Sequence, residues 1–475
     1  MKKKNDQLWL TYKTEELEQI QELNERYKAF LDRGKTEREC ASQAVTMAKE
    51  AGFRDLAEVI CGEEKLKAGD RVYAVCMNKA IALFNIGRKP LQEGMRILGA
   101  HIDSPRLDVK QNPLYEEAGM AYLDTHYYGG VKKYQWVTIP LSLHGVITKT
   151  DGSVIPVCIG EKDSDPVLCI TDLLIHLSAD QLEKKARVVI EGENLDVLIG
   201  SRPAVADAEG GAADGQGDAQ KPEKDAVRKN MLRLLKECCD LDEEDFLSAE
   251  FEIVPAGKAR DCGLDRSMVA SYGHDDRVCA FTSLDAFLET ESPEYTTCCL
   301  LVDKEEIGSV GATGMQSRFF ENTVAELMNA AGEYNELRLR RCLASSRMLS
   351  SDVSAAFDPL YAEVFERRNA AYLGRGLVFN KFTGARGKSG SNDANAEYLG
   401  WIRGVMDEAG VAWQTAELGK VDVGGGGTIA YISALYGMDV VDSGVAVLNM
   451  HAPLEVVSKA DVYEAKKGYL AFLKG

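Results

Sequence analysis

Residues 296–308, TTCCLLVDKEEIG, join a short apolar run to two adjacent glutamates. The run predicts a buried β-strand, so Glu305 and Glu306 stand just beyond a strand end. In open α/β sheets, ligands gather beyond the carboxyl ends of the strands. Two neighbouring glutamates there can divide the work of a metallohydrolase, because Glu306 can bind a metal ion while Glu305 takes a proton from water.

Adjacent glutamates are also common in solvated acidic turns, so the pair decides nothing by itself. Four other segments end an apolar run with a residue that binds metals. They are His101 in GAHIDSP, Asp275 in GHDDR, Asp352 in SSDVSAAFDP and His451 in NMHAP. Together with Glu306, these imidazoles and carboxylates suit a pair of Zn²⁺-like ions bridged by one carboxylate. The combined pattern predicts a two-metal hydrolase.

Neighbours of two predicted ligands suggest supporting roles. His101 and Asp103 are two residues apart, so their side chains share one face of an extended strand. We expect Asp103 to accept the second imidazole N–H and so fix the tautomer with which His101 binds the metal. Asp275 and Asp276 stand at the start of a predicted helix, where a carboxylate either caps the helix amides or bridges two ions. The adjacent His274 is expected to have a structural or supporting role.

Two parts of the chain are expected to fold differently. Helical spacing runs through residues 14–62, and later strand-like runs alternate with helix-like runs, which predicts an α/β domain built from residues 1–104 and 265–475. Residues 105–264 instead carry β-rich runs, namely QWVTIPLSLHGVITKTDGSVIPVCIG, ARVVIEGENL and AEFEIVPAG. This predicts an inserted β-rich domain. Within it, residues 204–225 lack apolar periodicity, which predicts a mobile acidic surface loop.

Composition argues against several classes of protein. The chain has 475 residues, 45% of them hydrophobic, and a net charge of −19. Nucleic-acid binding normally rests on clustered Lys and Arg, which this acidity argues against. The twelve cysteines show no CxxC spacing and mostly lie in apolar runs, as expected for reduced thiols in a cytoplasmic protein. Without a secretory h-region or an apolar stretch of about 18 residues, neither export nor membrane insertion is expected.

Other catalytic motifs fit less well. The six histidines contain no HExxH pair, which excludes a zincin site carried on one helix. The stretch FTGARGKSGS resembles the end of a P-loop, but Phe382 stands where that motif requires Gly. The four glycines at 424–427 are expected either to border a substrate pocket with their amides or to permit a tight turn.

Seven segments, in this order, resemble those of the M18 family of metallo-aminopeptidases, the aspartyl aminopeptidase and aminopeptidase I group. They are GAHIDSPRLDVK, YYGGVKKYQW, GHDDR, DKEEIGSVGATG, SSDVSAAFDP, GGGGTIAY and NMHAPLEVVSK. The resemblance spans residues 70–460. It implies a dinuclear zinc exopeptidase with a phosphorylase-like α/β catalytic domain and an inserted β-rich dimerisation domain. It also implies a homo-oligomer, a tetrahedral dodecamer built from dimers.

The resemblance also implies roles for individual residues. The matching metal ligands are His101, Asp275, Glu306, Asp352 and His451, with Asp275 as the bridge. Glu305 matches the general base, and Asp103 matches the residue that orients His101. His176, in DLLIHL, matches a histidine that family members present to a neighbouring subunit's active site; the alternative is a buried core residue on an apolar helical face. The residues that match the family's substrate-binding groups are Lys381, Gly426, Gly427 and Thr428.

The expected enzyme is a metal-dependent aminopeptidase that releases the N-terminal residue from short unblocked peptides. Two Zn²⁺ ions per subunit are expected, although Co²⁺ or Mn²⁺ suits the same ligands. TGARGKSGSNDAN and VTIPL depart from the corresponding aspartyl aminopeptidase segments, so acidic and neutral N-terminal residues stay equally open. Lys381, Arg386 or Lys388 would supply the cation that an acidic side chain needs. The alternatives are a related two-metal deacylase or carboxypeptidase, and a non-catalytic assembly protein with the same fold.

Overall fold

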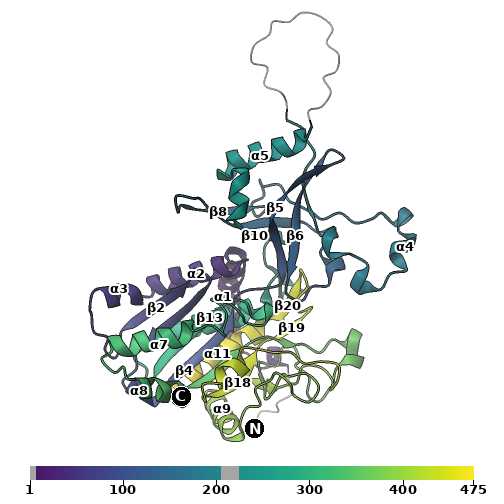
Figure 1. The fold of residues 1–475 in the computed structure, drawn as a ribbon. Coiled ribbons are helices and arrows are strands. Elements are labelled where there is room, and N and C mark those ends of the chain that lie inside the picture. The colour runs from purple at the N-terminus through teal and green to yellow at the C-terminus, as the bar shows by residue number, and fades with distance from the viewer. Residues whose placement is uncertain (1–6, 205–223) are drawn as a thin grey trace, which may run out of the picture. The chain divides into compact units, whose positions relative to one another are not determined.

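The structure is a computed structural model that describes residues 7–204 and 224–475. The chain forms two compact units. One is built from Met1–Ser104 and Lys258–Gly475, and the other from Pro105–Gly257. Each unit contains its own β-sheet (Figure 1). The predicted acidic loop lies almost entirely outside the described residues.

A nine-stranded mixed sheet forms the centre of the larger unit. Its strands, in spatial order, are β1 (Arg54–Asp55), β2 (Arg71–Cys76), β3 (Ala80–Asn85), β13 (Thr296–Val302), β4 (Met95–His101), β14 (Arg347–Ser351), β18 (Asp439–Gly444), β16 (Leu377–Asn380) and β17 (Trp413–Thr415). The four central strands, β13, β4, β14 and β18, run parallel to one another. Their carboxyl ends therefore meet at one edge of the sheet, where ligands of α/β proteins gather.

Helices cover both faces of this sheet (Figure 1). Along β13, Cys299 and Leu301 enter one hydrophobic core, while Cys298, Leu300 and Val302 enter the other. The uninterrupted apolar run CCLLV, which follows two buried threonines, is typical of a strand buried on both faces. The first core includes α1 (Thr14–Arg33), α2 (Glu37–Glu50), α6 (His274–Leu288), α9 (Ala396–Glu408) and α11 (Lys459–Lys474). The second includes α3 (Leu56–Cys61), α7 (Phe319–Ala330), α8 (Glu336–Ser345) and α10 (Ala430–Ala434).

The helices α1, α2 and α3 account for the helical spacing seen in residues 14–62, and α2 shows why its start is well defined. Thr36 and Glu39 form a capping box, in which each side chain accepts a hydrogen bond from the other residue's backbone N–H. Such a box satisfies two N–H groups that the first helical turn leaves without partners. The predicted α/β class is confirmed.

A second, five-stranded sheet belongs to the same unit. Its strands, in spatial order, are β11 (Arg260–Cys262), β12 (Met268–Ser271), β20 (Glu455–Ser458), β19 (Ala446–Leu448) and β15 (Ser354–Ala355). The chain leaves β19, passes through His451 and returns as β20, which pairs antiparallel with β19. This sheet therefore presents His451 from a tight connection rather than from a long loop.

The smaller unit is built around a six-stranded antiparallel sheet. Its strands, in spatial order, are β8 (Val154–Ile159), β7 (Leu141–Thr148), β10 (Glu250–Pro255), β5 (Arg106–Glu117), β6 (Met120–Tyr128) and β9 (Val197–Gly200), and its helices are α4 (Ala179–Leu182) and α5 (Ala226–Cys239). One strand prediction was wrong. ARVVIEGENL forms two 3-10 turns, Ala186–Val188 and Gly192–Asn194, and most of its side chains are exposed, so no sheet face buries alternate residues there.

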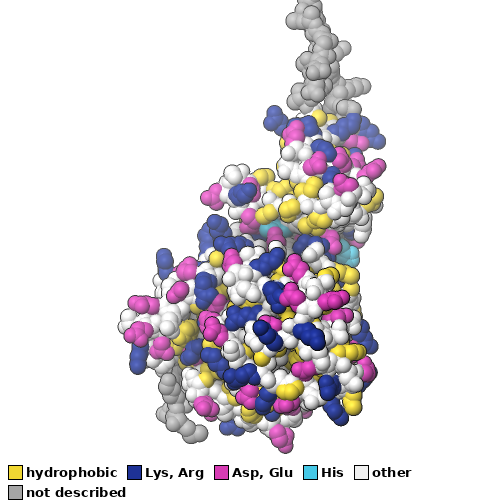
Figure 2. Space-filling model, turned by 90° about the vertical axis from the view of Figure 1, so that its left-hand side faces the viewer, with side chains coloured by type: hydrophobic (Ala, Val, Ile, Leu, Met, Phe, Trp, Pro, Cys, Tyr) yellow, Lys and Arg dark blue, Asp and Glu magenta, His cyan; other side chains and the backbone are white. Residues whose placement is uncertain are grey.

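Charge is distributed evenly over the visible surface of the larger unit. Acidic and basic side chains are interspersed on the face shown in Figure 2, without a continuous basic patch on that face. Among residues 7–204 and 224–475, none of the helices combines the length and apolar character that crossing a membrane requires.

Candidate metal centre

Three of the predicted ligands lie at the ends of neighbouring strands. His101 is the last residue of β4, Glu306 lies in a short 3-10 helix (Glu305–Ile307) that follows β13, and Asp352 directly follows β14. Because β13, β4 and β14 are adjacent and parallel, these side chains meet at one sheet edge. Asp275 reaches the same place from the start of α6, and His451 reaches it from the connection between β19 and β20.

Asp275 lies between the two imidazoles. Its Oδ1 is 3.2 Å from His101 Nε2, and its Oδ2 is 3.2 Å from His451 Nε2. Its backbone is not helical, and Gly273 rather than an aspartate occupies the N-cap position of α6 without a side-chain capping bond. Of the two roles open to Asp275, the structure thus argues against the helix cap, and its carboxylate instead contacts both imidazoles.

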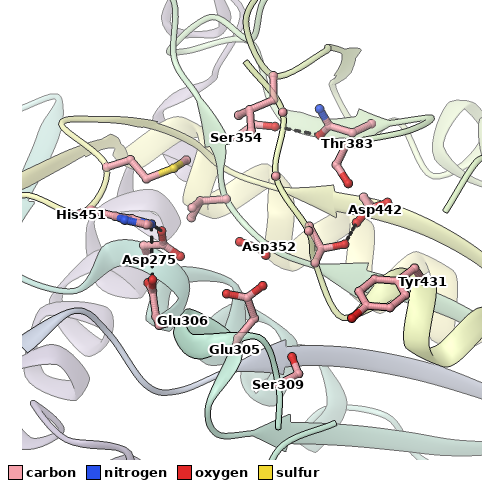
Figure 3. Close-up of a pocket in the computed structure, with 18 of the residues that line it drawn as sticks. Asp275, Glu305, Glu306, Ser309, Asp352, Ser354, Thr383, Tyr431, Asp442 and His451 are labelled. Carbon is pink, nitrogen blue, oxygen red and sulfur yellow. Dashed lines mark hydrogen bonds and ion pairs between the residues drawn. The ribbon is translucent and has the colours of Figure 1, made fainter. Parts of the chain in front are cut away.

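Each of the remaining carboxylates lies near one of the two histidines. Glu306 Oε2 is 3.6 Å from His451 Nε2, while Asp352 Oδ1 and Glu305 Oε2 are 3.8 and 3.9 Å from His101 Nε2. Two overlapping groups have potential ligand atoms within 4.8 Å of one another, namely His101 with Glu305 and Asp352, and His101 with Asp275 and Glu306. The structure therefore brings together all five predicted ligands and the predicted base. Figure 3 shows Asp275, Glu305, Glu306, Asp352 and His451 around the pocket.

These residues fit a metal ion because several of their buried atoms have no other partner. His101 Nε2, Asp275 Oδ1 and Glu306 Oε1 are buried without a hydrogen bond. Buried polar atoms normally find a partner, since leaving one unsatisfied is costly. Imidazole nitrogens and carboxylate oxygens are ordinary zinc ligands, and a cation among them would satisfy all three atoms.

Electrostatics supports the same conclusion. Burial, together with the carboxylates of Asp352 and Asp275 and against the opposing effect of His101, raises the pKa of Glu305 to about 8. Burial likewise raises the pKa of Glu306 and of Asp352 above their ordinary values. Burial opposes ionisation of Asp275 too, but the adjacent imidazoles of His101 and His451 hold its pKa below the ordinary value. This many carboxylates ionise together only beside a strong positive charge.

Asp103 is completely buried and contacts both His101 and the backbone of the two glutamates. His101 Nδ1 lies 3.1 Å from the Asp103 carbonyl oxygen and 3.3 Å from its Oδ1. The backbone N–H groups of Glu305 and Glu306 donate to Asp103 Oδ1 and Oδ2, each at 3.2 Å. Asp103 thus contacts the imidazole as predicted and also fixes the turn that carries both glutamates, which the sequence had not suggested.

A pocket of about 420 Å³ opens over these side chains. Gly426, Gly427 and Thr428, which the resemblance places at the substrate, line it. Lys381 does not. Its side chain is exposed, and the neighbouring residues Asn380 and Thr383 line the pocket in its place.

His176 belongs to the smaller unit and is exposed. It lies in a 3-10 turn (Ile175–Leu177) whose apolar neighbours Ile175 and Leu177 are 67% and 68% exposed. The alternative of a buried core residue on an apolar helix was therefore wrong. Among the described residues, none packs over the turn Ile175–Leu177 so as to bury its side chains.

Two carboxylates of the site were missed by the sequence reasoning. Asp442, in β18, is buried at the pocket wall, where its Oδ1 accepts a hydrogen bond of 2.5 Å from Thr428 Oγ1 (Figure 3). Glu455, the first residue of β20, is buried and accepts backbone N–H bonds from Asp275 and His451. Neither follows a strand end, so neither carries the signal that marked the other ligands.

Comparison with known proteins decides the family. The protein-family model described as aminopeptidase I zinc metalloprotease (M18) matches residues 30–473 of this chain. The chain belongs to the M18 family. As an M18 member it is a zinc metallo-aminopeptidase, an enzyme that removes N-terminal residues.

Individual M18 relatives match along their full length. The chain is 57% identical over 465 residues to a probable M18 family aminopeptidase 1 of Clostridium acetobutylicum, covering 98% of this chain and 97% of that protein. It resembles the crystal structure of aminopeptidase I from the same organism with a TM-score of 0.89 at 53% identity, covering 100% of both chains. An M18 aminopeptidase structure from Thermotoga maritima gives a TM-score of 0.90 at 41% identity over 99% of both chains. The S. cerevisiae mApe1 dodecamer, at 17% identity, shares the fold with a TM-score of 0.73 over 95% of this chain and 96% of that one.

Proposed function

We propose that this M18 aminopeptidase binds two zinc ions through His101, Asp275, Glu306, Asp352 and His451, with Asp275 bridging them and Glu305 acting as general base. The observation that carries the proposal is the position of Asp275, whose two oxygens each lie 3.2 Å from a different imidazole Nε2. A carboxylate between two histidines is the arrangement that a bridged pair of ions needs. His101 and Asp352 would hold one ion, and His451 and Glu306 the other.

Glu305 suits the role of base because it lies beside the ligands and opens into the pocket. Its side chain is 15% exposed, whereas that of Glu306 is 3% exposed. Glu305 also lines the pocket, so a water molecule or a substrate amide can reach its carboxylate. A base must come within hydrogen-bond reach of the proton that it removes.

The mechanism then divides between the ions and the protein. Bound zinc would polarise the scissile carbonyl and acidify water. Glu305 takes the proton from the attacking water and returns it to the nitrogen of the leaving amine. Asp103 keeps Glu305 in place through the backbone N–H bond at 3.2 Å. The free α-amino group of the peptide carries a positive charge that the surrounding carboxylates attract.

We further propose that the preferred N-terminal residue is neutral. Among the described residues that line the pocket there is no Lys or Arg, while Val353, Leu418 and Met450 contribute apolar surface. Lys388, one of the cations considered for an acidic substrate, lies 2.9 Å from Asp393 and stacks over the ring of Phe382. An acidic side chain would therefore enter a pocket rich in carboxylates without a cation to pair with it.

A panel of unblocked dipeptides tests both proposals. The chelated protein should release no free amino acid, and restored Zn²⁺, Co²⁺ or Mn²⁺ should return activity, with Leu-led peptides cleaved faster than Asp- or Glu-led ones. Cleavage of a peptide with a blocked N-terminus would point instead to the deacylase or carboxypeptidase alternative. Faster release of Asp or Glu would overturn the neutral preference while leaving the metal centre intact.

We also propose that the smaller unit forms contacts between subunits of a homo-oligomer. Four apolar side chains around His176 are exposed, namely Leu173, Leu174, Ile175 and Leu177. Apolar side chains clustered on a surface commonly mark an interaction site. The dodecamer formed by the S. cerevisiae relative gives the expected stoichiometry. Sedimentation of the purified protein should show twelve times the chain mass, and a monomer would refute the proposal.

A further inference from the structure

The two halves of the metal centre are joined by a carboxylate that is not a ligand. Glu455 begins β20 and is 1% exposed. Its Oε1 accepts a hydrogen bond of 2.7 Å from the His451 backbone N–H, and its Oε2 accepts one of 3.1 Å from the Asp275 backbone N–H. One side chain thus holds the backbone of two proposed ligands that come from distant parts of the sequence.

His451 depends on such a tether more than the other ligands do. Its side chain is 35% exposed, whereas those of His101 and Asp275 are 1% and 5% exposed, so packing restrains it less. Its backbone also has φ = 67°, in the left-handed region that residues other than glycine rarely adopt. A residue stays in such a conformation only when its surroundings determine it, and the hydrogen bond to Glu455 Oε1 supplies that restraint.

We infer that Glu455 is a positioning residue for the metal centre, which sets the separation of Asp275 and His451 before any ion binds. The inference rests on the proposed function, because it assumes that Asp275 and His451 are ligands. Glu455 itself has both oxygens committed to backbone donors, so it acts through these two residues and not on the substrate. Its effect should therefore appear in metal affinity.

The substitution Glu455→Gln isolates this role. Glutamine has the same shape, but its amide offers one acceptor oxygen and one NH₂ donor. Only one of the two backbone N–H groups can keep its acceptor, and the other faces a second donor. Groups that orient metal ligands typically contribute about 10- to 100-fold in metal affinity, so zinc binding to E455Q should weaken by roughly that factor.

Asp461 provides a matched control in the same unit. It is also completely buried, and its two oxygens accept backbone N–H bonds from Gly376 and Gly374 at 2.6 and 2.7 Å. Asp461→Asn therefore removes the same kind of backbone clamp at a place that holds no proposed ligand. Any general loss of stability from such a change should appear in both variants, whereas weaker zinc binding should appear only in E455Q.

The experiment is a zinc titration of the chelator-stripped, full-length protein in competition with a chromogenic zinc indicator. Wild type and D461N should bind zinc equally, and E455Q should bind it more weakly and regain turnover as free zinc is raised, with KM for a dipeptide unchanged. Equal zinc affinity in E455Q and wild type would overturn the inference, as would equal weakening in D461N.

Two further results remain interpretable. Wild type that binds no zinc would refute the proposed metal centre itself, which separates that failure from a failure of the inference. If E455Q does not fold, Glu455→Asp keeps the charge with a shorter reach and should fold with intermediate zinc affinity. Failure of both variants to fold, while D461N folds, would show that Glu455 serves the fold rather than the metal centre and would also overturn the inference.

Discussion

Replacing Glu305 by glutamine should remove catalysis while leaving the metal centre intact. The structure explains why the replacement is tolerated. The turn that carries Glu305 and Glu306 is fixed by their backbone N–H bonds to Asp103, each 3.2 Å long, and not by their side chains. An amide of the same shape at position 305 therefore leaves this turn, and the ligand Glu306 beside it, in place.

The expected magnitude follows from the loss of proton transfer. Glutamine cannot accept the proton that Glu305 is proposed to take from water. A positioned general base contributes about 10²- to 10⁴-fold, so kcat should fall by that factor, which corresponds to roughly 3–5 kcal/mol in the activation barrier. KM for a neutral dipeptide should change little, because Glu305 is not proposed to hold the substrate.

Glu306→Gln is the matched comparison, since the two residues are adjacent and differ only in their proposed task. Glu306 is the more buried side chain, and its Oε2 lies 3.6 Å from His451 Nε2. We expect this variant to lose zinc, so that its remaining activity rises with added zinc, whereas excess zinc should not rescue E305Q. The assay combines steady-state release of leucine from a Leu-led dipeptide with the zinc content of each purified variant.

The reasoning is refuted if E305Q turns over at the wild-type rate with its zinc retained. It is also refuted if E305Q loses zinc while E306Q keeps it, because the roles of base and ligand would then be exchanged.

Two further predictions concern stability. Burial raises the pKa of Asp442 to about 7, against the opposing effect of the hydrogen bond from Thr428. The folded state therefore binds an extra proton between pH 4 and pH 7 and loses stability as pH rises through that range. Asp442→Asn should remove this loss. Measured by urea unfolding from pH 4 to pH 8, the free energy of unfolding of the variant should rise by up to roughly 4 kcal/mol relative to that of wild type. Parallel pH profiles of the two proteins would contradict this prediction. Leu300→Ala, in fully buried β13, should lower the free energy of unfolding by about 2–5 kcal/mol. Leu264→Ala, at a fully exposed side chain, should lower it by less than about 0.5 kcal/mol. Similar losses in the two variants would count against the burial of β13 between two cores.

Local sequence rules predicted most of the larger unit. TTCCLLV is typical of a strand buried on both faces because it carries no charged residue and five consecutive apolar ones, and the alternate side chains of residues 298–302 do enter two separate cores. The same rules failed for ARVVIEGENL, where the valines suggested a strand and the chain turns instead. β-propensity reflects packing against a neighbouring strand, and that neighbour is not visible in a local window.

Most of the proposed ligands could be recognised in the sequence because strand ends are marked locally. An apolar run followed by His or a carboxylate identifies His101, Glu306 and Asp352 without knowledge of the fold. Glu455 and Asp442 carry no such mark. Each is a polar residue within a strand that holds other polar residues, and its importance comes from the backbone N–H or hydroxyl group that the fold brings to it.

The sequence by itself determined which residues are available for chemistry, the faces and strand ends on which they lie, and the family to which the chain belongs. The tertiary structure decided how they meet. Only the fold places Asp275 between His101 and His451, turns the side chain of Lys381 to solvent and commits both oxygens of Glu455 to backbone donors. The physical reason is that spacing along a chain fixes direction within one helix or strand, whereas distances between elements are set by the packing of helices and sheets around a shared core.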